Sequence, residues 1–223
     1  MSAPDPIVNA PDLLVVTAVA AEADAVRAGA DPARVRVEPV GVGPAAAGAG
    51  TARLLALAEA AGTPYRAVLS AGIGGGFPGR AAVGATVLGV RAVAADLGAE
   101  TPDGFLPVER LGFGTSVMSA DDTLVKALGK ALPEAVTGDI LTLATVTGTA
   151  ATAADLATRF PAAAAEAMEG YGVACAAAIT GTPFAELRAV SNAVGPRDRQ
   201  AWRIPEALSA LTRAARALST LGV

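Results

Sequence analysis

Apolar residues in this chain fall into short runs separated by longer, alanine-rich stretches. The runs are rich in valine, leucine and isoleucine, which favours β-strands, and they predict strands over residues 13–18, 35–42, 67–72, 85–93, 140–148 and 187–191. The alanine-rich stretches favour helices, which we expect over residues 22–29, 45–61, 121–132, 153–160, 166–179 and 205–218. Strands therefore alternate with helices along most of the chain.

This alternation predicts the architecture. Continuous apolar strands connected by helices are typical of a parallel sheet that is buried on both faces. We therefore expect the α/β class, with a single domain whose mostly parallel central sheet is covered by helices on both faces. Because no linker or repeat divides the chain, residues 1–12 are assigned to an N-terminal extension and residues 13–223 to one domain. Ligands of such sheets bind beyond the carboxyl ends of the strands.

The composition narrows the chemistry available to such a site. The chain has no histidine and one cysteine, which excludes a Ser-His-Asp triad, a histidine-ligated zinc and an internal disulfide. We expect neither a metal nor a cofactor. A net charge of -4 without a run of lysine and arginine gives no reason to expect a nucleic-acid partner. No basic residue precedes Arg27 and no apolar stretch is long enough to span a membrane, so we expect a cytoplasmic protein.

Two candidate segments follow the first two strands. Glu22 lies in the first turn of the first predicted helix, where the helix dipole alone would explain an isolated glutamate. The second strand is followed by GVGPAAAG, residues 41–48. This segment matches a dinucleotide-binding fingerprint, but no acidic residue ends the next strand to hold a ribose. Taken alone, it predicts a tight turn that packs a helix closely against the sheet.

The third strand leads into SAGIGGGFPG, residues 70–79. Glycines remove side chains at the expected ligand edge, so that backbone N–H and C=O groups can approach a flat or anionic ligand. A flexible turn is the alternative, but flexibility does not explain why the glycines directly follow a core strand. We therefore predict a ligand-binding loop, with Gly72, Ile73 and Gly74 as its binding residues.

A second acidic residue lies in an apolar environment. Glu169 falls within the predicted helix 166–179, whose later residues are almost all apolar or small. A helix that is apolar all round is a buried helix, and a buried carboxylate is costly unless it is hydrogen-bonded. Hydroxyl groups of a ligand would supply the donors. A structural partner such as Arg188 or Arg197 is the alternative.

Together these segments resemble the motifs of the nucleoside phosphorylase and nucleosidase superfamily, especially the methylthioadenosine/S-adenosylhomocysteine nucleosidases. Each motif is weak alone, but all occur in the order that the family has, at successive strand ends. The resemblance extends from about residue 13 to the C-terminal helix. It rests on Glu22, GVGPAAAG at 41–48, SAGIGGG at 70–76, AMEG at 167–170 and RAVSN at 188–192.

The resemblance implies a role for each matching residue. In those nucleosidases the acid matching Glu22 activates water, the acid matching Glu169 binds the ribose hydroxyls, and the methionine matching Met168 packs against the sugar. In the same nucleosidases, the residue that matches Asn192 is an aspartic acid, which protonates adenine at N7. Asparagine offers N–H donors but cannot act as a proton donor in acid catalysis. Asn192 therefore favours a 6-oxopurine, which has an O6 acceptor beside N7, over adenine.

The segment SNAVGPRDRQAWRI, residues 191–204, resembles the futalosine hydrolases of this superfamily. That likeness implies an enzyme that hydrolyses futalosine, a small-molecule nucleoside of menaquinone biosynthesis, and releases hypoxanthine. The benzoate on the tail of futalosine would suit an arginine, and Arg197 and Arg199 are the candidates. Alternatively, Asp198 caps a helix that begins at Arg199, and both arginines are solvated. Asp198 is also a candidate proton source for the leaving base.

Two other functions remain open at this stage. A phosphate-dependent purine nucleoside phosphorylase would bring arginine to the phosphate, but the segment after the third strand has none before Arg80. A noncatalytic nucleoside-binding protein would keep Glu169 and the glycines without needing Glu22. The resemblance further implies a homo-oligomer, by analogy with dimeric nucleosidases whose second subunit adds an aromatic residue to the pocket. Phe105 and Phe113 are the candidates for that residue.

Overall fold

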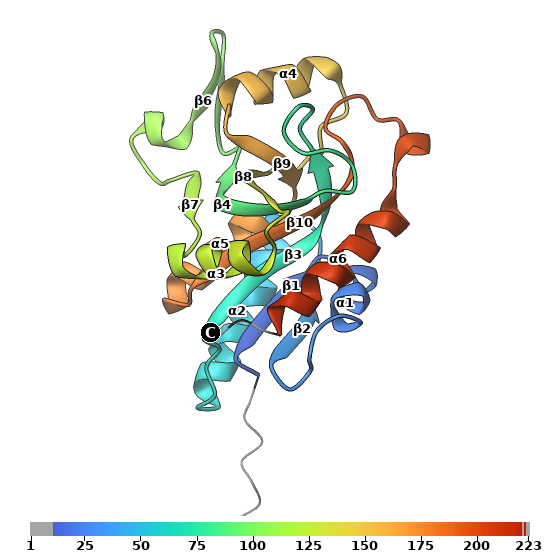
Figure 1. Cartoon of the computed structure of the whole chain (residues 1–223). Helices are drawn as coiled ribbons and strands as arrows, with labels where there is room; N and C mark the ends of the chain where they lie inside the picture. Colours follow the sequence, from blue (N-terminus) through green and yellow to red (C-terminus); the bar gives the residue numbers. More distant parts are fainter. Residues whose placement is uncertain (1–10, 220, 222–223) are drawn as a thin grey trace, which may run out of the picture.

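The computed structural model describes residues 11–219 and 221. The predicted N-terminal extension, residues 1–12, therefore lies outside the described residues except for its last two positions. The described part forms a large sheet with helices packed around it, and a small hairpin extends from one end (Figure 1).

The large sheet contains eight strands. They are β1 (Leu13–Thr17), β2 (Val35–Pro39), β3 (Ala67–Gly76), β4 (Thr86–Ala94), β7 (Val117–Ser119), β8 (Val136–Thr142), β9 (Ala163–Ala167) and β10 (Phe184–Ala193). The hairpin consists of β5 (Gly98–Thr101) and β6 (Gly104–Pro107). Short 3-10 helices are η1 (Val108–Leu111) and η2 (Arg199–Ala201).

The helices lie close to the predicted positions. They are α1 (Ala20–Arg27), α2 (Pro44–Ala60), α3 (Asp122–Ala131), α4 (Ala150–Arg159), α5 (Gly170–Thr180) and α6 (Ile204–Leu218). Within the residues that the structure describes, none of these helices has both the length and the apolar character needed to cross a bilayer.

The sheet is mixed: five of its strand pairings are parallel, so the expected mostly parallel arrangement is found only in part. Its order is β10-β4-β8-β9-β3-β1-β2, β7 pairs with β4, and β10 also pairs with β3. Strands β3, β10, β4, β8 and β9 thus form a closed ring resembling a small barrel. Three of the pairings are antiparallel: β10 with β4, β3 with β9, and β4 with β7. The chain connects β3 to β4 without a helix, and a parallel crossover needs a longer connection.

The predicted start of α5 was also wrong. Residues 163–167 form strand β9, so the helix predicted over 166–179 begins only at Gly170. The sequence of β9 is AAAEA, and alanine and glutamate do not favour strands. β9 forms because β8 pairs with it along one edge and β3 along the other. Tertiary pairing therefore overrides the local preference here.

Helices cover both faces of the sheet, as expected. In β1, Leu13 and Val15 belong to one apolar cluster, which also contains residues of α1, α3 and α6. The alternating residues Leu14 and Val16 belong to a second cluster, with residues of α2 and α5. Successive side chains of a strand point to opposite faces. The period of two in β1 therefore matches one layer of helices on each side.

Helices α2 and α5 pack at unusually short range through small residues. A Cβ atom added at Gly172 of α5 would lie 2.0 Å from the backbone oxygen of Pro44, and one at Gly48 of α2 would lie 3.1 Å from the backbone oxygen of Gly172. Because the obstructing atoms belong to the backbone, a rotamer change cannot relieve these contacts. This packing therefore explains why glycine occupies these two positions.

We predict that Gly172→Ala lowers the free energy of unfolding by about 1–3 kcal/mol, the usual cost of overpacking. The matched control is Gly129→Ala in α3, where the nearest atom to an added Cβ is 3.9 Å away. That change should raise stability by up to about 1 kcal/mol through helix propensity. Urea unfolding followed by circular dichroism measures both effects. Equal stability of the two variants would contradict the close helix packing.

Candidate active site

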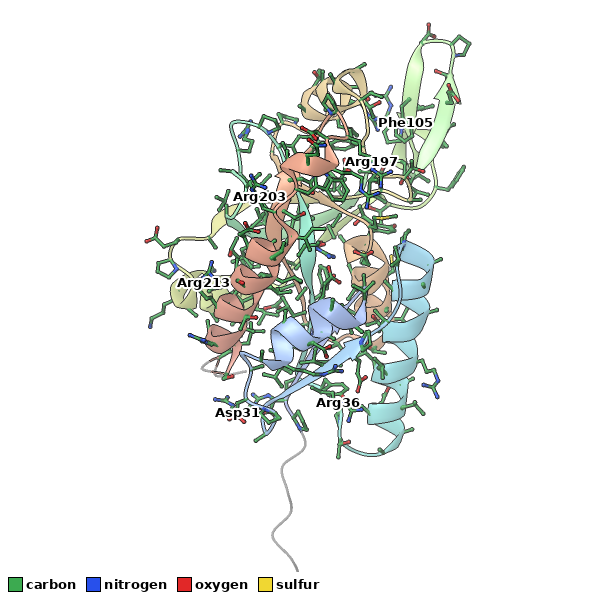
Figure 2. The ribbon with its side chains drawn as sticks, turned by 90° about the vertical axis from the view of Figure 1, so that its right-hand side faces the viewer. Asp31, Arg36, Phe105, Arg197, Arg203 and Arg213 are labelled. Atoms are coloured by element: carbon green, nitrogen blue, oxygen red, sulfur yellow. The ribbon has the colours of Figure 1, made fainter. Side chains whose placement is uncertain are left out.

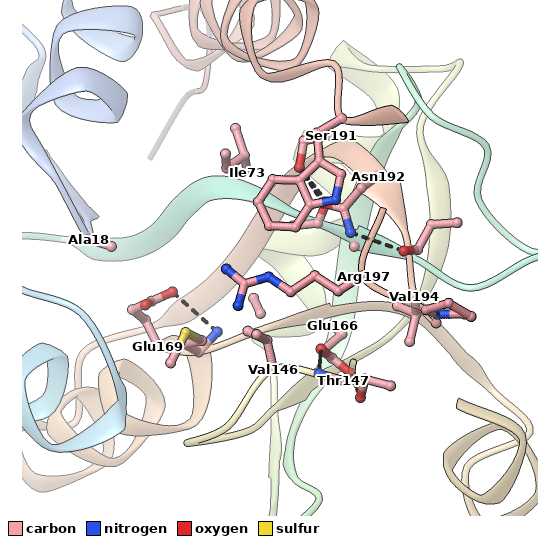
Figure 3. Close-up of a pocket in the computed structure, with 18 of the residues that line it drawn as sticks. Ala18, Ile73, Val146, Thr147, Glu166, Glu169, Ser191, Asn192, Val194 and Arg197 are labelled. Atoms are coloured by element: carbon pink, nitrogen blue, oxygen red, sulfur yellow. Dashed lines mark hydrogen bonds between the residues drawn. The ribbon is translucent and has the colours of Figure 1, made fainter. Parts of the chain in front are cut away.

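One pocket lies near the carboxyl ends of β1, β3, β9 and β10 (Figure 3). It brings together residues that are far apart in the sequence. Of the residues singled out from the sequence, its lining includes Glu22, Ile73, Gly74, Met168, Glu169, Asn192 and Arg197. Gly72 and Arg199 are not among the lining residues.

Backbone N–H groups hold the carboxylate of Glu22. One oxygen accepts hydrogen bonds from the N–H groups of Ala18, at 3.0 Å, and Val19, at 3.3 Å. The other accepts from the N–H of Ile73 on β3, at 2.9 Å. Glu22 does sit at the start of α1, as the simpler interpretation of the sequence requires, but the bond to Ile73 also attaches it to the pocket floor. It is buried, with 4% of its surface exposed.

The glycine-rich segment is part of strand β3 and not a loop, which corrects the sequence prediction. A Cβ at Gly72 would lie 2.6 Å from Oε1 of Glu22 and 2.7 Å from Nη1 of Arg188. A Cβ at Gly74 would lie 2.7 Å from the backbone oxygen of Glu166. These glycines thus let charged side chains and a neighbouring strand approach β3. Gly74 lines the pocket, whereas Gly72 lies against Glu22 and Arg188 and is not among the lining residues.

Glu169 lies at the N-terminal end of α5, as its N-cap residue, and not within the helix. Its Oε1 accepts from the N–H of Gly43, at 3.2 Å, and its Oε2 from the N–H of Met168, at 3.3 Å. Oε2 also accepts from Nη1 of Arg188, at 3.2 Å. The structural partner that the sequence left open is therefore present and is Arg188. Glu169 nevertheless lines the pocket, so it can meet a ligand as well.

Arg188 is the centre of a buried ionic network beneath the pocket. Its Nε donates to Oε1 of Glu186 at 3.0 Å, and its Nη2 donates to Oγ of Ser70 at 2.9 Å. Nη2 also lies 2.9 Å from Oε1 of Glu186, as an ion pair. Arg188 is 1% exposed and Glu186 0% exposed. Burial raises the pKa of Glu186 to about 7, although the charge of Arg188 acts in the opposite direction. Oε2 of Glu186 has no hydrogen-bond partner among the described residues.

A β-bulge in β10 directly precedes Asn192 and shifts its register against β3. In the register of β10 with β3, Val190 faces Gly74 and Asn192 faces Gly75, so Ser191 is the extra residue. The hydroxyl of Ser191 donates to Oδ1 of Asn192 at 2.8 Å, which orients the amide. Nδ2 donates to the backbone oxygen of Ala193 at 3.0 Å. Because an amide nitrogen carries two hydrogens, a second N–H of Asn192 remains for a ligand.

The segment after β10 supplies a cation and an aromatic ring to the pocket. Arg197 and Trp202 both line it, with the guanidinium of Arg197 5.6 Å from the centroid of the Trp202 ring. The side chain of Arg197 extends across the pocket in Figure 3. Asp198 accepts from the N–H of Gln200 at 3.0 Å and caps η2, which begins at Arg199. Of the two arginines, only Arg197 therefore lines the pocket.

Sequence reasoning missed Glu166, a third acidic residue of the pocket. It is 5% exposed, and its Oε1 accepts from the N–H of Thr147 at 2.7 Å. Its Oε2 is hydrogen-bonded to the hydroxyl of the same threonine. Burial raises the pKa of Glu166, while the bonds from Thr147 lower it. The residue could not be found without strand β9, which places it at the pocket.

The hairpin carries one of the two candidate aromatic residues. Phe105 lies in β6, with the guanidinium of Arg159 4.1 Å from its ring centroid. Phe113 follows η1 and is 66% exposed. Figures 1 and 2 show the hairpin and the segment around Arg197 at the same end of the molecule. Across the residues that the structure describes, no group of cysteine and acidic side chains is arranged to hold a metal ion.

Comparison with known proteins identifies the family. Residues 24–222 match the sequence profile of the family described as the phosphorylase superfamily. The chain belongs to the phosphorylase superfamily. The matched residues cover almost the whole of the described structure and include all of the residues that line the pocket except Ala18 and Glu22.

Curated relatives within the superfamily carry one name. A futalosine hydrolase from Streptomyces coelicolor is 61% identical over 153 residues, which cover 69% of this chain and 65% of that protein. A futalosine hydrolase from Thermus thermophilus is 39% identical over 169 residues, which cover 72% of each chain. The chain is therefore a member of the same family as these proteins. It spans slightly less than two thirds of the length of the Streptomyces protein.

Solved structures of other proteins share the fold of this chain. A methylthioadenosine/S-adenosylhomocysteine nucleosidase from Neisseria meningitidis, in complex with methylthio-immucillin-A, matches with a TM-score of 0.79 at 20% identity. The match covers 94% of this chain and 99% of that one. A futalosine hydrolase from Helicobacter pylori matches with a TM-score of 0.78 at 15% identity, over 94% and 97% of the two chains. At these identities the likeness establishes the fold alone.

We predict that Glu186 makes the stability of this protein depend on pH. Its pKa is about 7 in the folded state and 4.5 when free, so between these values the folded state keeps a proton that the unfolded state has lost. The free energy of unfolding should therefore fall as the pH rises from about 4.5 to 7, by on the order of 1 kcal/mol per pH unit. Urea unfolding at a series of pH values measures this slope.

The slope should become smaller in Glu186→Gln, because glutamine does not titrate. Glu59→Gln removes an exposed glutamate of α2 and serves as the control. Its free energy of unfolding should depend on pH with the same slope as that of the wild type. A Glu186→Gln variant that keeps the wild-type slope would show that the titration of Glu186 does not cause it.

Proposed function

We propose that this superfamily member is a cytoplasmic nucleosidase of menaquinone biosynthesis, which hydrolyses the N-glycosidic bond of futalosine and releases hypoxanthine. The observation that carries the proposal is the convergence of Glu22, Glu169 and Asn192 on one pocket. The two acids can act on the sugar and the attacking water, and the amide can bind the purine that leaves. The names of the curated relatives support the choice of futalosine.

The two acids would act on the sugar. Cleavage of a glycosidic bond passes through a transition state in which the sugar ring becomes cationic. Glu22, fixed by backbone N–H groups, takes a proton from the attacking water, and general-base help of this kind contributes about 100- to 10,000-fold. Glu169 accepts from the ribose hydroxyls, and its negative charge stabilises the ring more strongly as positive charge develops. Met168 lies beside Glu169 and packs against the sugar.

Asn192 would bind the leaving base. Its remaining N–H donates to O6 or N7 of hypoxanthine, where negative charge builds as the bond breaks. Since asparagine supplies no acidic proton, the base must be protonated by another group. Asp198 is engaged in capping η2 and does not line the pocket. We therefore assign this proton to water.

Water is also the favoured nucleophile. Phosphate binding generally uses several charged or N–H donors. Arg197 is the single arginine or lysine in the described lining of the pocket, and Arg188 below it is already bonded to Glu169 and Glu186. This arrangement favours hydrolysis over phosphorolysis.

We further propose that the enzyme is a homo-oligomer, as its resemblance to the dimeric nucleosidases implies. Phe113 is exposed in the single chain and lies close in sequence to β7, at the edge of the sheet. A second subunit would cover such a side chain or receive it in its own pocket. Phe105 is less available for that role, because Arg159 covers its ring.

We predict release of hypoxanthine from futalosine at a rate that does not depend on phosphate. Futalosine, inosine and methylthioadenosine are each incubated with the protein, with and without phosphate, and the free base is separated by chromatography. Adenine should not be released from methylthioadenosine at a comparable rate. A requirement for phosphate would identify a phosphorylase instead.

Glu22→Gln separates an enzyme from a binding protein. In this variant kcat should fall by about 100-fold or more, because the general base is lost while the shape of the side chain is kept. The dissociation constant for futalosine should change little. Full activity in Glu22→Gln would remove Glu22 from the mechanism.

Arg197 is predicted to bind the benzoate on the tail of futalosine. Loss of a charge-assisted hydrogen bond costs about 1.5–3 kcal/mol, so Arg197→Gln should lower kcat/KM for futalosine by about 10- to 100-fold. Inosine has no such tail, and its kcat/KM should change little. Arg199→Gln, an exposed neighbour outside the pocket, is the matched control and should leave both values unchanged. Equal losses for both substrates would refute the assignment.

A further inference from the structure

Glu166 has no part in the mechanism described above, yet it is a buried carboxylate that lines the pocket. The carboxylate of Glu166 is hydrogen-bonded to the N–H and the hydroxyl of Thr147. Among the described residues, it forms no ion pair with an arginine or lysine. A carboxylate oxygen can accept more than one hydrogen bond. Each oxygen of Glu166 can therefore still accept a donor from a ligand.

The sheet register places Glu166 and Asn192 on either side of one glycine. Gly75 of β3 is paired with Glu166 of β9 and with Asn192 of β10. Residues that pair in register point to the same face of a sheet. Neighbouring strands are about 4.8 Å apart, so the two Cα atoms are separated by roughly 10 Å. A Cβ at Gly75 would lie 3.0 Å from Cγ2 of Val194 and 3.4 Å from Nδ2 of Asn192, so the missing side chain lets both residues approach β3 at this point.

The chemistry of this pair is complementary to one kind of base. A 6-oxopurine has a hydrogen-bond acceptor, O6, next to a donor, N1–H. Asn192 offers an N–H donor beside Gly75, since its Nδ2 lies 3.4 Å from the position of a Cβ at that glycine. Glu166 offers an acceptor on the opposite side. All three residues line the same pocket.

We propose that Glu166 determines base specificity by accepting a hydrogen bond from N1–H of the 6-oxopurine while Asn192 donates to O6 or N7. This inference rests on the proposed function, because it takes a 6-oxopurine as the ligand. Adenine is rejected by the same pair. Its N1 is an acceptor that would face the carboxylate, and its 6-amino group is a donor that would face the amide N–H.

Burial of Glu166 makes this discrimination stronger. A buried acceptor without a donor has lost its hydrogen bonds to water and gains none in return. The mismatch with adenine therefore costs more binding free energy in this pocket than it would in water. The raised pKa of Glu166 shows that burial already disfavours its ionised form. An N–H donated by the base would stabilise that form.

The alternative is a purely structural role, in which Glu166 only anchors the segment around Thr147 that follows β8. A structural residue would affect all ligands alike. A residue that contacts N1 would instead affect a base with N1–H and leave an N1-methylated base almost unchanged. Comparison of hypoxanthine with 1-methylhypoxanthine therefore separates the two roles.

The test is a binding titration of hypoxanthine, 1-methylhypoxanthine and adenine to the full chain. Trp202 is the only tryptophan in the sequence and lines the pocket, so its fluorescence reports occupancy. The wild type should bind hypoxanthine at least about tenfold more tightly than either other base. In Glu166→Ala the affinity for hypoxanthine should fall by about 10- to 100-fold, and the preference over 1-methylhypoxanthine should disappear.

Two further variants complete the test. Glu166→Gln keeps the size of the side chain and can still bond to Thr147, so it covers the case in which the alanine variant does not fold. Its amide N–H can donate to N1 of adenine, and the preference for hypoxanthine over adenine should therefore shrink by about tenfold or more. Asp155→Asn removes an exposed charge on α4 and should leave all three affinities unchanged.

The outcomes for the two proposals are separate. Failure to release hypoxanthine from futalosine refutes the proposed function, and that result is read from wild-type turnover alone. If the wild type releases hypoxanthine but Glu166→Ala and Glu166→Gln keep the wild-type preference among the three bases, the role of Glu166 is refuted while the proposed function stands. Equal weakening of all three bases would likewise show that Glu166 is only structural.

Discussion

The fully buried guanidinium of Arg188 is the interaction on which the rest of the site depends. A charge removed from water is tolerated only with close partners, and Arg188 has Glu186 on its own strand and Glu169 at the start of α5. These contacts join β10, α5 and β3 beneath the pocket. They also explain two glycines: a Cβ at Gly72 would collide with Arg188 and Glu22, and one at Gly170 would lie 2.0 Å from Glu186.

Further hydrogen bonds arrange the site before any ligand binds. Backbone N–H groups hold Glu22 and Glu169, and the hydroxyl of Ser191 orients the amide of Asn192. Groups fixed in this way need little rearrangement when charge develops on a substrate, which is the basis of electrostatic catalysis. The pocket can therefore stabilise a cationic sugar at one end and a departing base at the other. Closure of the strands into a ring brings these ends together, because β10 and β9 both pair with β3.

Much of this site could be predicted from the sequence, because strong local patterns mark it. Glu22, Glu169 and Asn192 each stand next to an apolar strand or helix, and their order along the chain matches a known family. Strand β9 could not be predicted, since its alanines favour a helix and only pairing on both edges makes it a strand. Glu166 was missed for the same reason. The extended form of the glycine-rich segment was missed because its cause, the approach of Arg188 and Glu22, is not local.

By itself, the sequence determined the α/β class, the helices and the types of residue available for chemistry, because propensity, periodicity and composition are properties of the local chain. Only the tertiary structure decided the mixed, closed sheet, the partner of Glu169 and the residues that share the pocket. Those features depend on contacts between different elements, from Glu169 with Arg188, 19 positions apart, to Gly43 with Glu169, 126 positions apart. Such contacts leave no local pattern, since each exists only after distant strands and helices have packed together.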